Sequence, residues 1–271
     1  MFEVLGFQFF QNALIIAVLA SIAAGVIGSY IVIKRMSLIS GSIAHTAFGG
    51  LGIGYFLNAN PLVGGTIFSL ISAVSIALFK KNAKNRIDTL LSFLWATGMA
   101  IGLVFIFLTP GYATDLFTYL FGNILLVSKF DLYMILILDV VILATVYLMY
   151  NSFLAVTFDE EYSETRNMPV TIVNMILFGL IALTIVATIK VVGIVLMIAI
   201  LTIPAATAQM FYKTVKKIMI TSSIITLFAT ISGLFISYYL NFPTGPIIVL
   251  IISAIYLGGI FLSKLRVPYS N

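Results

Sequence analysis

The sequence predicts an all-α membrane protein, a polytopic bundle of about nine transmembrane helices, with eight as the alternative count. Hydrophobic residues make up 62% of the 271 residues, charged residues only 8%, and the mean hydropathy is +1.19. Soluble domains are about a quarter charged, so this composition excludes them. Polar runs do not exceed roughly 20 residues, the length of a connecting loop. We therefore expect a single transmembrane domain over residues 1–271.

Each crossing needs about 20 apolar residues, because an α-helix rises 1.5 Å per residue. On this basis we expect helices at 9–33, 42–58, 61–79, 88–109, 131–150, 168–189, 191–212, 217–238 and 244–263. The first span has no basic residue before it, so we expect it to stay in the mature chain rather than be cleaved as a signal peptide.

Basic residues gather in short clusters at the ends of these spans. The clusters are Lys34 with Arg35, residues 80–86, residues 213–217, and Lys264 with Arg266. Such clusters are typical of cytoplasmic loops, so an odd number of spans places the N-terminus outside and the C-terminus inside. They also account for the net charge of +5 without any nucleic-acid partner.

The segment 34–55 carries His45, the one histidine of the chain, into a predicted span. An ionisable group inside lipid is costly and usually lines a polar path or pairs with a partner. Small residues surround it, which allows a helix to approach closely or leaves open volume beside the ring. The alternative is a histidine that is only hydrogen-bonded between packed helices.

Between the fourth and fifth spans, the apolar core of segment 109–131 runs only from Leu116 to Val127, too short to cross. We expect a re-entrant or surface half-helix with Asp115 as N-cap. Irregular backbone at membrane depth is tolerated where protein or water covers it, so this segment suggests the outer mouth of a pathway.

The longest polar stretch is 151–167. Thr157 and Glu160 have capping-box spacing, and acidic residues favour a helix N-terminus, so we expect a short helix from about Asp159. Its charge and aromatic content suggest a docking element on the cytoplasmic face; the alternative is a plain amphipathic surface loop. Pro169 then fits the first turn of the next span.

Three further features stand out in the later spans. Pro204 interrupts the seventh span and leaves the carbonyl of Ile200 without its usual donor, which Thr202 and Thr207 could replace. Such a kink fits a moving pathway and simple packing equally well. Asp139 lies within the fifth span and must face protein or water; a structural Asp139, either hydrogen-bonded or protonated, is favoured over a transport role. The turn 241–246 is rich in Pro and Gly and predicts a rigid outer rim.

Several kinds of chemistry are absent from the sequence. The chain has no G-x-x-x-x-G-K-[ST] phosphate loop, no H-E-x-x-H and no G-x-S-x-G motif. Without cysteine and with one histidine, it cannot build a high-affinity zinc site of three or four such ligands. We expect no enzyme activity and no bound cofactor, and any metal would be held weakly, as in a conduit.

Five motifs in order resemble the permease subunits of the zinc, manganese and iron ABC importers, the ZnuB-like family. The motifs are SLISGSIAHTAFGG (37–50), DLFTYLFGNIL (115–125), FLAVTFDEEYSETRNMPV (153–170), VVGIVLMIAILTIPAATA (191–208) and SYYLNFPTGPIIVL (237–250). The resemblance covers nearly the whole chain. It implies a type II importer permease in a prokaryotic cell membrane that carries a divalent transition metal, zinc first and manganese or iron next.

The resemblance also implies partners and site residues. The partners are a cytoplasmic ABC ATPase, an extracytoplasmic metal-binding protein, a second copy of the permease and the surrounding lipid. The segment 157–167 becomes the coupling helix, whose ATPase-coupling residues are Asp159, Glu160, Glu161, Tyr162, Glu164 and Arg166. The implied translocation path contains His45, Gly41, Ser42, Gly49, Asp115, Asn123 and Pro204, with His45 as the metal contact.

The chain departs from the family pattern at three of these positions. The family has a metal-contacting Asp at the position of Gly41, a Pro at Gly49 and a second Asp at Asn123. The carboxylate and imidazole pair four residues apart is therefore missing, and metal contact rests on His45 with a possible symmetry mate. A stand-alone channel or secondary transporter remains the alternative function, and an intramembrane enzyme is less favoured.

Overall fold

The computed structural model describes residues 6–82, 86–110, 122, 124 and 127–266, and the elements in these ranges are all helices, as predicted. The long helices are α1 (Gln8–Ile33), α2 (Leu38–Phe56), α3 (Pro61–Asn82), α4 (Ile87–Leu108), α6 (Lys129–Leu148), α9 (Val170–Val192), α10 (Ile194–Phe211), α11 (Val215–Leu240) and α12 (Thr244–Arg266). Two short helices, α7 (Tyr150–Phe158) and α8 (Glu160–Thr165), lie between α6 and α9.

Eight of the long helices, all except α2, are long and apolar enough to cross a membrane. Helix α2 has 19 residues, but its glycines, serines and histidine keep its mean hydropathy below that of the eight spans. Every residue from 39 to 52 is buried, so neighbouring helices cover α2. The predicted count of about nine, or eight, therefore corresponds to eight apolar helices and one long helix enclosed by protein.

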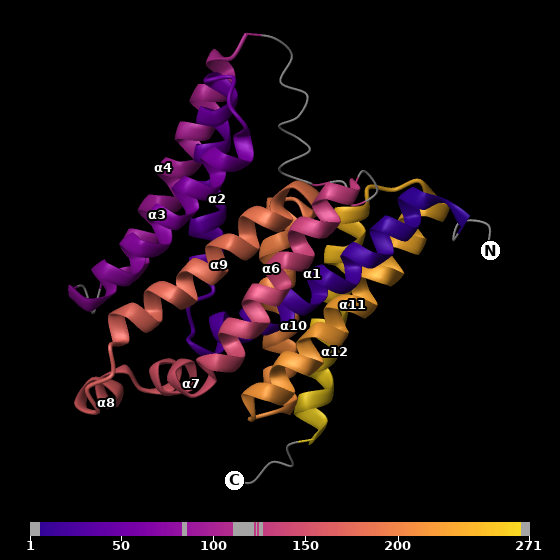
Figure 1. The fold of residues 1–271 in the computed structure, drawn as a ribbon. Helices are drawn as coiled ribbons and strands as arrows, with labels where there is room; N and C mark the ends of the chain where they lie inside the picture. The colour runs from indigo at the N-terminus through magenta and orange to yellow at the C-terminus, as the bar shows by residue number, and fades with distance from the viewer. Residues whose placement is uncertain (1–5, 83–85, 111–121, 123, 125–126, 267–271) are drawn as a thin grey trace.

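The helices form two groups (Figure 1). In one, α2 packs against α3 and against α4. In the other, α1 packs against α6, α10 and α11, and α12 packs against α10 and α11. The groups meet where α3 packs against α9. In α1 and α9, 72% of the residues of the apolar window are buried, the highest share among the eight spans. These two helices lie at the centre of the contacts described above.

Helix α7 was not predicted, because residues 151–158 were assigned to a polar loop. This assignment is wrong for a physical reason: Phe153 is fully buried and packs edge to face on Tyr30, with ring centroids 5.5 Å apart. Val156, three residues later on the same helical face, is also buried. This apolar stripe is the signal that would have predicted α7.

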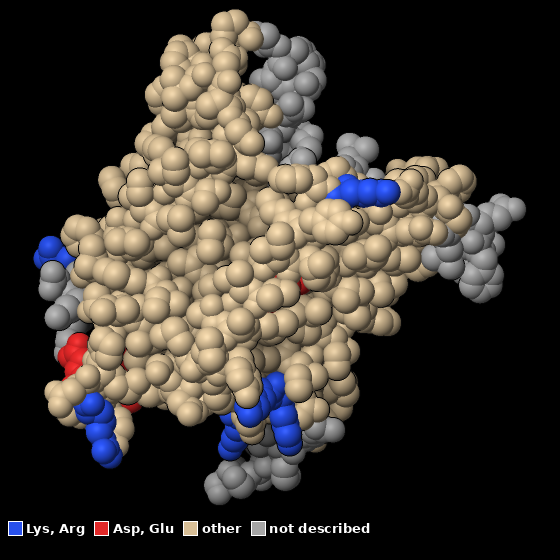
Figure 2. Space-filling model, in the orientation of Figure 1, with Lys and Arg blue, Asp and Glu red and all other residues tan. Residues whose placement is uncertain are grey.

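One end of the molecule collects the short helices and most of the basic side chains. Lys34 and Lys80 reach Glu160 of α8, and Lys216 lies over the ring of Tyr150 at 5.0 Å. Figure 1 shows α7, α8 and the end of α12 together at the lower end, and Figure 2 shows blue side chains along the same edge, with red ones beside α8. We call this the basic end.

Candidate functional site

Helix α2 lies very close to both of its neighbours through glycine contacts. A Cβ at Gly49 would lie 2.8 Å from the carbonyl oxygen of Gly98 in α4, and one at Gly54 would lie 2.8 Å from Cα of Pro61 in α3. Side chains there would force the helices apart. The small-residue segment therefore serves close helix approach, the first of the two predicted roles.

The imidazole of His45 lies between α2 and α4. It is 8% exposed, its ring stacks on Trp95 at 4.5 Å between centroids, and Nδ1 lies 3.1 Å from Sδ of Met99. A thioether sulfur is a weak acceptor, so Nδ1 is satisfied when it carries the proton. Sequence reasoning missed both α4 partners, because contacts between helices are not visible in a one-dimensional pattern.

Trp95 also occupies the space above Gly41. A Cβ at Gly41 would overlap the six-membered ring of Trp95. A side chain at position 41 is therefore incompatible with this position of the indole. The aromatic ring fills volume where the family pattern has a carboxylate, which makes the surroundings of His45 less polar.

Ser42 binds to backbone rather than to open space. Its single hydroxyl proton is shared between the carbonyl oxygens of Leu38 at 2.9 Å and Leu91 at 2.8 Å. The side chain thus joins α2 to α4. In the described part of the chain, no group of three or more His, Cys, Asp or Glu side chains could hold a metal ion.

Pro204 is buried inside α10, and the helix continues through it. The prediction that Thr202 and Thr207 re-satisfy the carbonyl of Ile200 is wrong. Their hydroxyls donate to the carbonyls of Ile198 at 2.8 Å and Ile203 at 2.9 Å, each four residues back along the helix. This local bonding is common for threonine in helices and needs no break.

The predicted half-helix with Asp115 and Asn123 lies outside the described residues. Gly122 is described: it has a φ of 67°, and a Cβ there would overlap the backbone of Val192 and Gly193 between α9 and α10. Only glycine accepts both this conformation and this approach easily. The structure thus places one residue of the motif against the α9–α10 junction.

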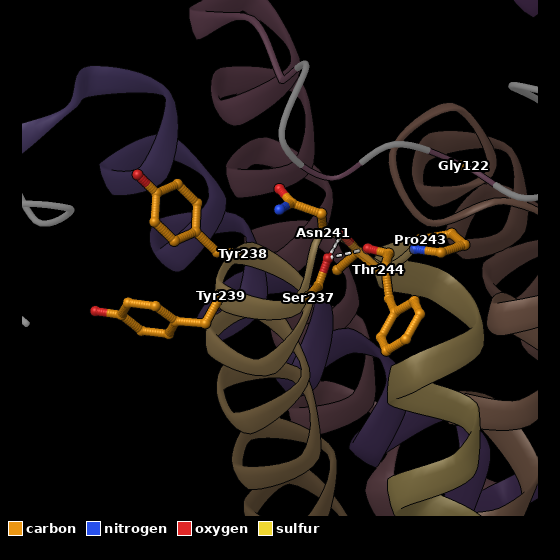
Figure 3. A pocket seen from close by; sticks show the side chains of 8 residues that line it. Gly122, Ser237, Tyr238, Tyr239, Asn241, Pro243 and Thr244 are labelled. Atoms are coloured by element: carbon orange, nitrogen blue, oxygen red, sulfur yellow. Dashed lines mark hydrogen bonds between the residues drawn. The ribbon is translucent and has the colours of Figure 1, made fainter.

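An open pocket of about 650 Å³ lies beside the turn between α11 and α12 (Figure 3). This turn is at the end of the bundle opposite α7 and α8 (Figure 1). The turn between α11 and α12 forms one wall: Asn241 ends α11 in the left-handed conformation, and the hydroxyl of Ser237 lies 2.8 Å from that of Thr244. Ser237 also donates to the carbonyl of Phe242 at 2.6 Å. These bonds hold the predicted rim in one conformation.

The N-cap of helix α8 lies two residues later than the Thr157–Glu160 spacing predicted. Asp159, not Thr157, is the N-cap, because its carboxylate accepts from the backbone N–H of Tyr162 at 2.9 Å. The Thr157 hydroxyl is buried without a hydrogen-bond partner among the described residues. Arg166, which follows the last residue of α8, donates to the Tyr162 hydroxyl at 2.8 Å. Both side chains are exposed.

The predicted coupling residues divide into two sets. Five are exposed: Asp159, Glu161, Tyr162, Glu164 and Arg166. We call this set the outer face of α8. Glu160 instead turns inward, and its Oε1 lies 2.8 Å from Nζ of Lys34 and 2.5 Å from Nζ of Lys80.

These contacts shift two pKa values outside the spans. Burial, reinforced by the nearby charge of Lys80, lowers the pKa of Lys34 to about 8 although Glu160 opposes the shift. Burial alone would raise the pKa of Glu160, but the two ammonium groups outweigh it and hold that pKa below its ordinary value. Glu160 is therefore ionised at neutral pH.

Comparison with known proteins decides the family. The model of the ABC 3 transport family matches residues 6–263, almost the whole chain. The chain belongs to the ABC 3 transport family. The resemblance that five short motifs indicated is thereby confirmed at family level.

Relatives in the ABC 3 family match along most of their length. A membrane protein of Synechocystis is 42% identical over 95% of this chain and 92% of its own. The manganese import system permease protein ScaB of Streptococcus parasanguinis is 33% identical over 95% and 91%. A structure described as PsaBC from Streptococcus pneumoniae in complex with Fab has a TM-score of 0.84 at 32% identity, covering 94% of this chain and 92% of that one.

Membership of the ABC 3 family and the eight apolar helices make this chain a multi-pass protein of a prokaryotic cell membrane.

Among the described residues, Asp139 of α6 forms no hydrogen bond to His45 or to α8. It is 3% exposed, and neither carboxyl oxygen has a hydrogen-bond partner within the described ranges. The described residues therefore do not support the hydrogen-bonded form of the predicted structural role, and the protonated form stays a prediction.

Proposed function

We propose that the chain is the permease subunit of an ATP-driven importer for a divalent transition metal. One observation carries the proposal most strongly: at the basic end, a short helix presents an exposed acidic and aromatic outer face and is bonded inward to the ends of the spans. Basic clusters mark cytoplasmic loops, so α8 faces the compartment that holds ATP.

The driving force must come from another subunit, because the sequence carries no phosphate-binding loop. We propose a cytoplasmic ABC ATPase as the partner that docks on the outer face of α8. At the opposite end, the pocket beside the 241–246 turn faces the compartment of an extracytoplasmic metal-binding protein. A second copy of the permease completes the translocation path.

Within the path, we propose His45 as the contact for the metal, which is cargo rather than a resident cofactor. Imidazole binds zinc and other first-row ions. Gly41 and Asn123 stand where the family pattern has carboxylates, so those ligands are missing. The sequence favoured zinc, and relatives such as ScaB are named for manganese import. Manganese and zinc are therefore the first two cations to test.

The test is uptake into liposomes that contain the permease with its ATPase and binding protein, compared with the permease alone. We expect metal to accumulate only when all three proteins and ATP are present. Metal flux through the permease alone, at a similar rate and without ATP, would overturn the proposal in favour of a stand-alone channel or secondary transporter.

A further inference from the structure

Three side-chain donors from three different helices converge on one oxygen of α8. Oε1 of Glu160 accepts from Lys34 at the end of α1 (2.8 Å), from Lys80 on α3 (2.5 Å) and from Nδ2 of Asn174 on α9 (3.2 Å). We call these four residues the Glu160 cluster. Lys34 additionally donates to the carbonyl of Val156 in α7 at 2.9 Å.

Burial and charge make the cluster depend on this carboxylate. The Lys34 side chain is 4% exposed, that of Lys80 is 22% exposed and that of Glu160 is 31% exposed. Two ammonium groups share a single negative charge. Without it the two ammonium groups would lie beside each other with no salt-bridge partner among the described residues, which is unfavourable for a side chain as buried as Lys34.

The cluster also connects α8 with the helix that carries His45. Lys80 belongs to α3, which packs against α2, where Gly64 lies against the backbone of Gly50. Close backbone contacts of this kind leave little space for one helix to shift without the other. A displacement of α8 thus reaches α2 through α3, and it reaches the central helix α1 through Lys34.

We propose that Glu160 is a positioning residue that transmits the displacement of α8 to α1, α3 and α9, rather than a contact for the ATPase. This inference rests on the proposed function and divides its coupling helix into two parts. The outer face binds the partner, and the inward carboxylate connects the helix to the spans.

The experiment compares Glu160→Gln with wild type in the full complex with ATPase and binding protein. We expect the variant to co-purify with the ATPase and to keep basal ATP hydrolysis, while metal uptake per ATP hydrolysed falls at least tenfold. Asp88→Asn, which removes an exposed acid from the first turn of α4, serves as the matched control and leaves the ratio unchanged.

A charge exchange keeps the test decisive if Glu160→Gln does not fold. Glu160→Lys with Lys80→Glu restores one opposite-charge pair between α8 and α3, so its uptake exceeds that of Glu160→Lys alone at least threefold. The inference is overturned by wild-type uptake per ATP in Glu160→Gln, by loss of ATPase binding in that variant, or by no gain from the exchange.

Failure of the proposed function would look different from failure of this inference. In that case the wild-type complex itself would show no ATP-driven uptake. A role of Glu160 in fold stability alone would lower the melting temperature and reduce uptake and hydrolysis in parallel, so that uptake per ATP would stay constant, and this result also overturns the inference.

Discussion

His45 is held by two side chains of α4, and these partners limit the directions from which the proposed metal could reach the imidazole. The Trp95 ring covers one face of the imidazole, and the Met99 thioether lies at Nδ1. The sequence identified His45 because a lone ionisable residue in an apolar span is conspicuous. It could not identify Trp95 and Met99, since apolar residues in a span are unremarkable until a neighbouring helix is placed.

The first prediction concerns His45 itself. His45→Ala lowers metal uptake by the complex about tenfold at limiting metal, equivalent to about 1.4 kcal/mol of lost binding, because imidazole is the strongest ligand of the proposed path. Uptake as a function of metal concentration measures this. Met99→Leu, which keeps the apolar volume, is the matched variant. Unchanged uptake in His45→Ala at limiting metal would return His45 to a structural role.

The second prediction concerns the contact between Gly41 and Trp95. Gly41→Ala introduces a Cβ into the volume of the indole and lowers the free energy of unfolding by about 1–3 kcal/mol, the usual cost of overpacking. Trp95→Ala in the same chain removes the overlap, so the two changes are not additive. Thermal unfolding of the wild type, the two single variants and the double variant in detergent measures the coupling, and simple additivity would contradict the described contact.

At the scale of elements, α7 and α8 show which features a local sequence pattern can predict and which it cannot. The acidic run predicted a short helix near Asp159, and α8 is there; the cap is Asp159 because its carboxylate reaches the N–H of Tyr162. The inward turn of Glu160 could not be predicted, because its partners Lys34 and Lys80 are distant in sequence. Six residues make fewer than two turns, too short for a helix that is stable by itself, so these contacts with the spans position α8.

The third prediction concerns the outer face of α8. Reversing the charges of Asp159, Glu161 and Arg166 together reduces co-purification of the ATPase at least tenfold, because charge complementarity across an interface governs partner choice. The melting temperature of the same permease falls only slightly, because these side chains are exposed and the lost N-cap bond of Asp159 is worth about 1 kcal/mol. A variant that still binds the ATPase and supports full uptake would show that docking occurs elsewhere.

The fourth prediction is a pH dependence from Lys34. Its pKa is about 8 in the folded chain and 10.5 ordinarily, so between these values the unfolded chain binds more protons and this group makes stability rise with pH. Above pH 8 the Lys34 ammonium group loses its proton, so its hydrogen bond to Glu160 is no longer charge-assisted. A charge-assisted hydrogen bond is stronger than a neutral one. Uptake per ATP therefore falls above pH 8 while this titration does not lower the melting temperature.

Lys34→Arg is the matched variant for this dependence, because a guanidinium stays charged throughout the range. We expect the decline above pH 8 to be much smaller in Lys34→Arg, measured as uptake per ATP across pH 7 to about 9.5. Identical profiles for the two proteins would mean that Lys34 does not control the coupling. The pKa of Glu160 is lowered, so its stabilising contribution is lost only on acidification below its ordinary range.

At the scale of the whole molecule, apolar length predicted the spans well, and most boundaries agree within a few residues. Helix α2 is instructive, since its glycines and His45 reduce its hydropathy yet close packing encloses it. The grouping of α2, α3 and α4 apart from the other spans could not be predicted, because it arises from contacts between helices. Likewise, Asp115 and Asn123 remain predicted path residues outside the described ranges.

The central claim is that the exposed outer face of α8 works from the cytoplasmic side of the membrane. The chain contains no cysteine, so Glu164→Cys provides a single reactive thiol on that face. We predict that an impermeant maleimide labels this variant in inverted membrane vesicles but not in intact cells, and that bound ATPase protects it. Labelling from outside intact cells, with no protection by the ATPase, would contradict the account.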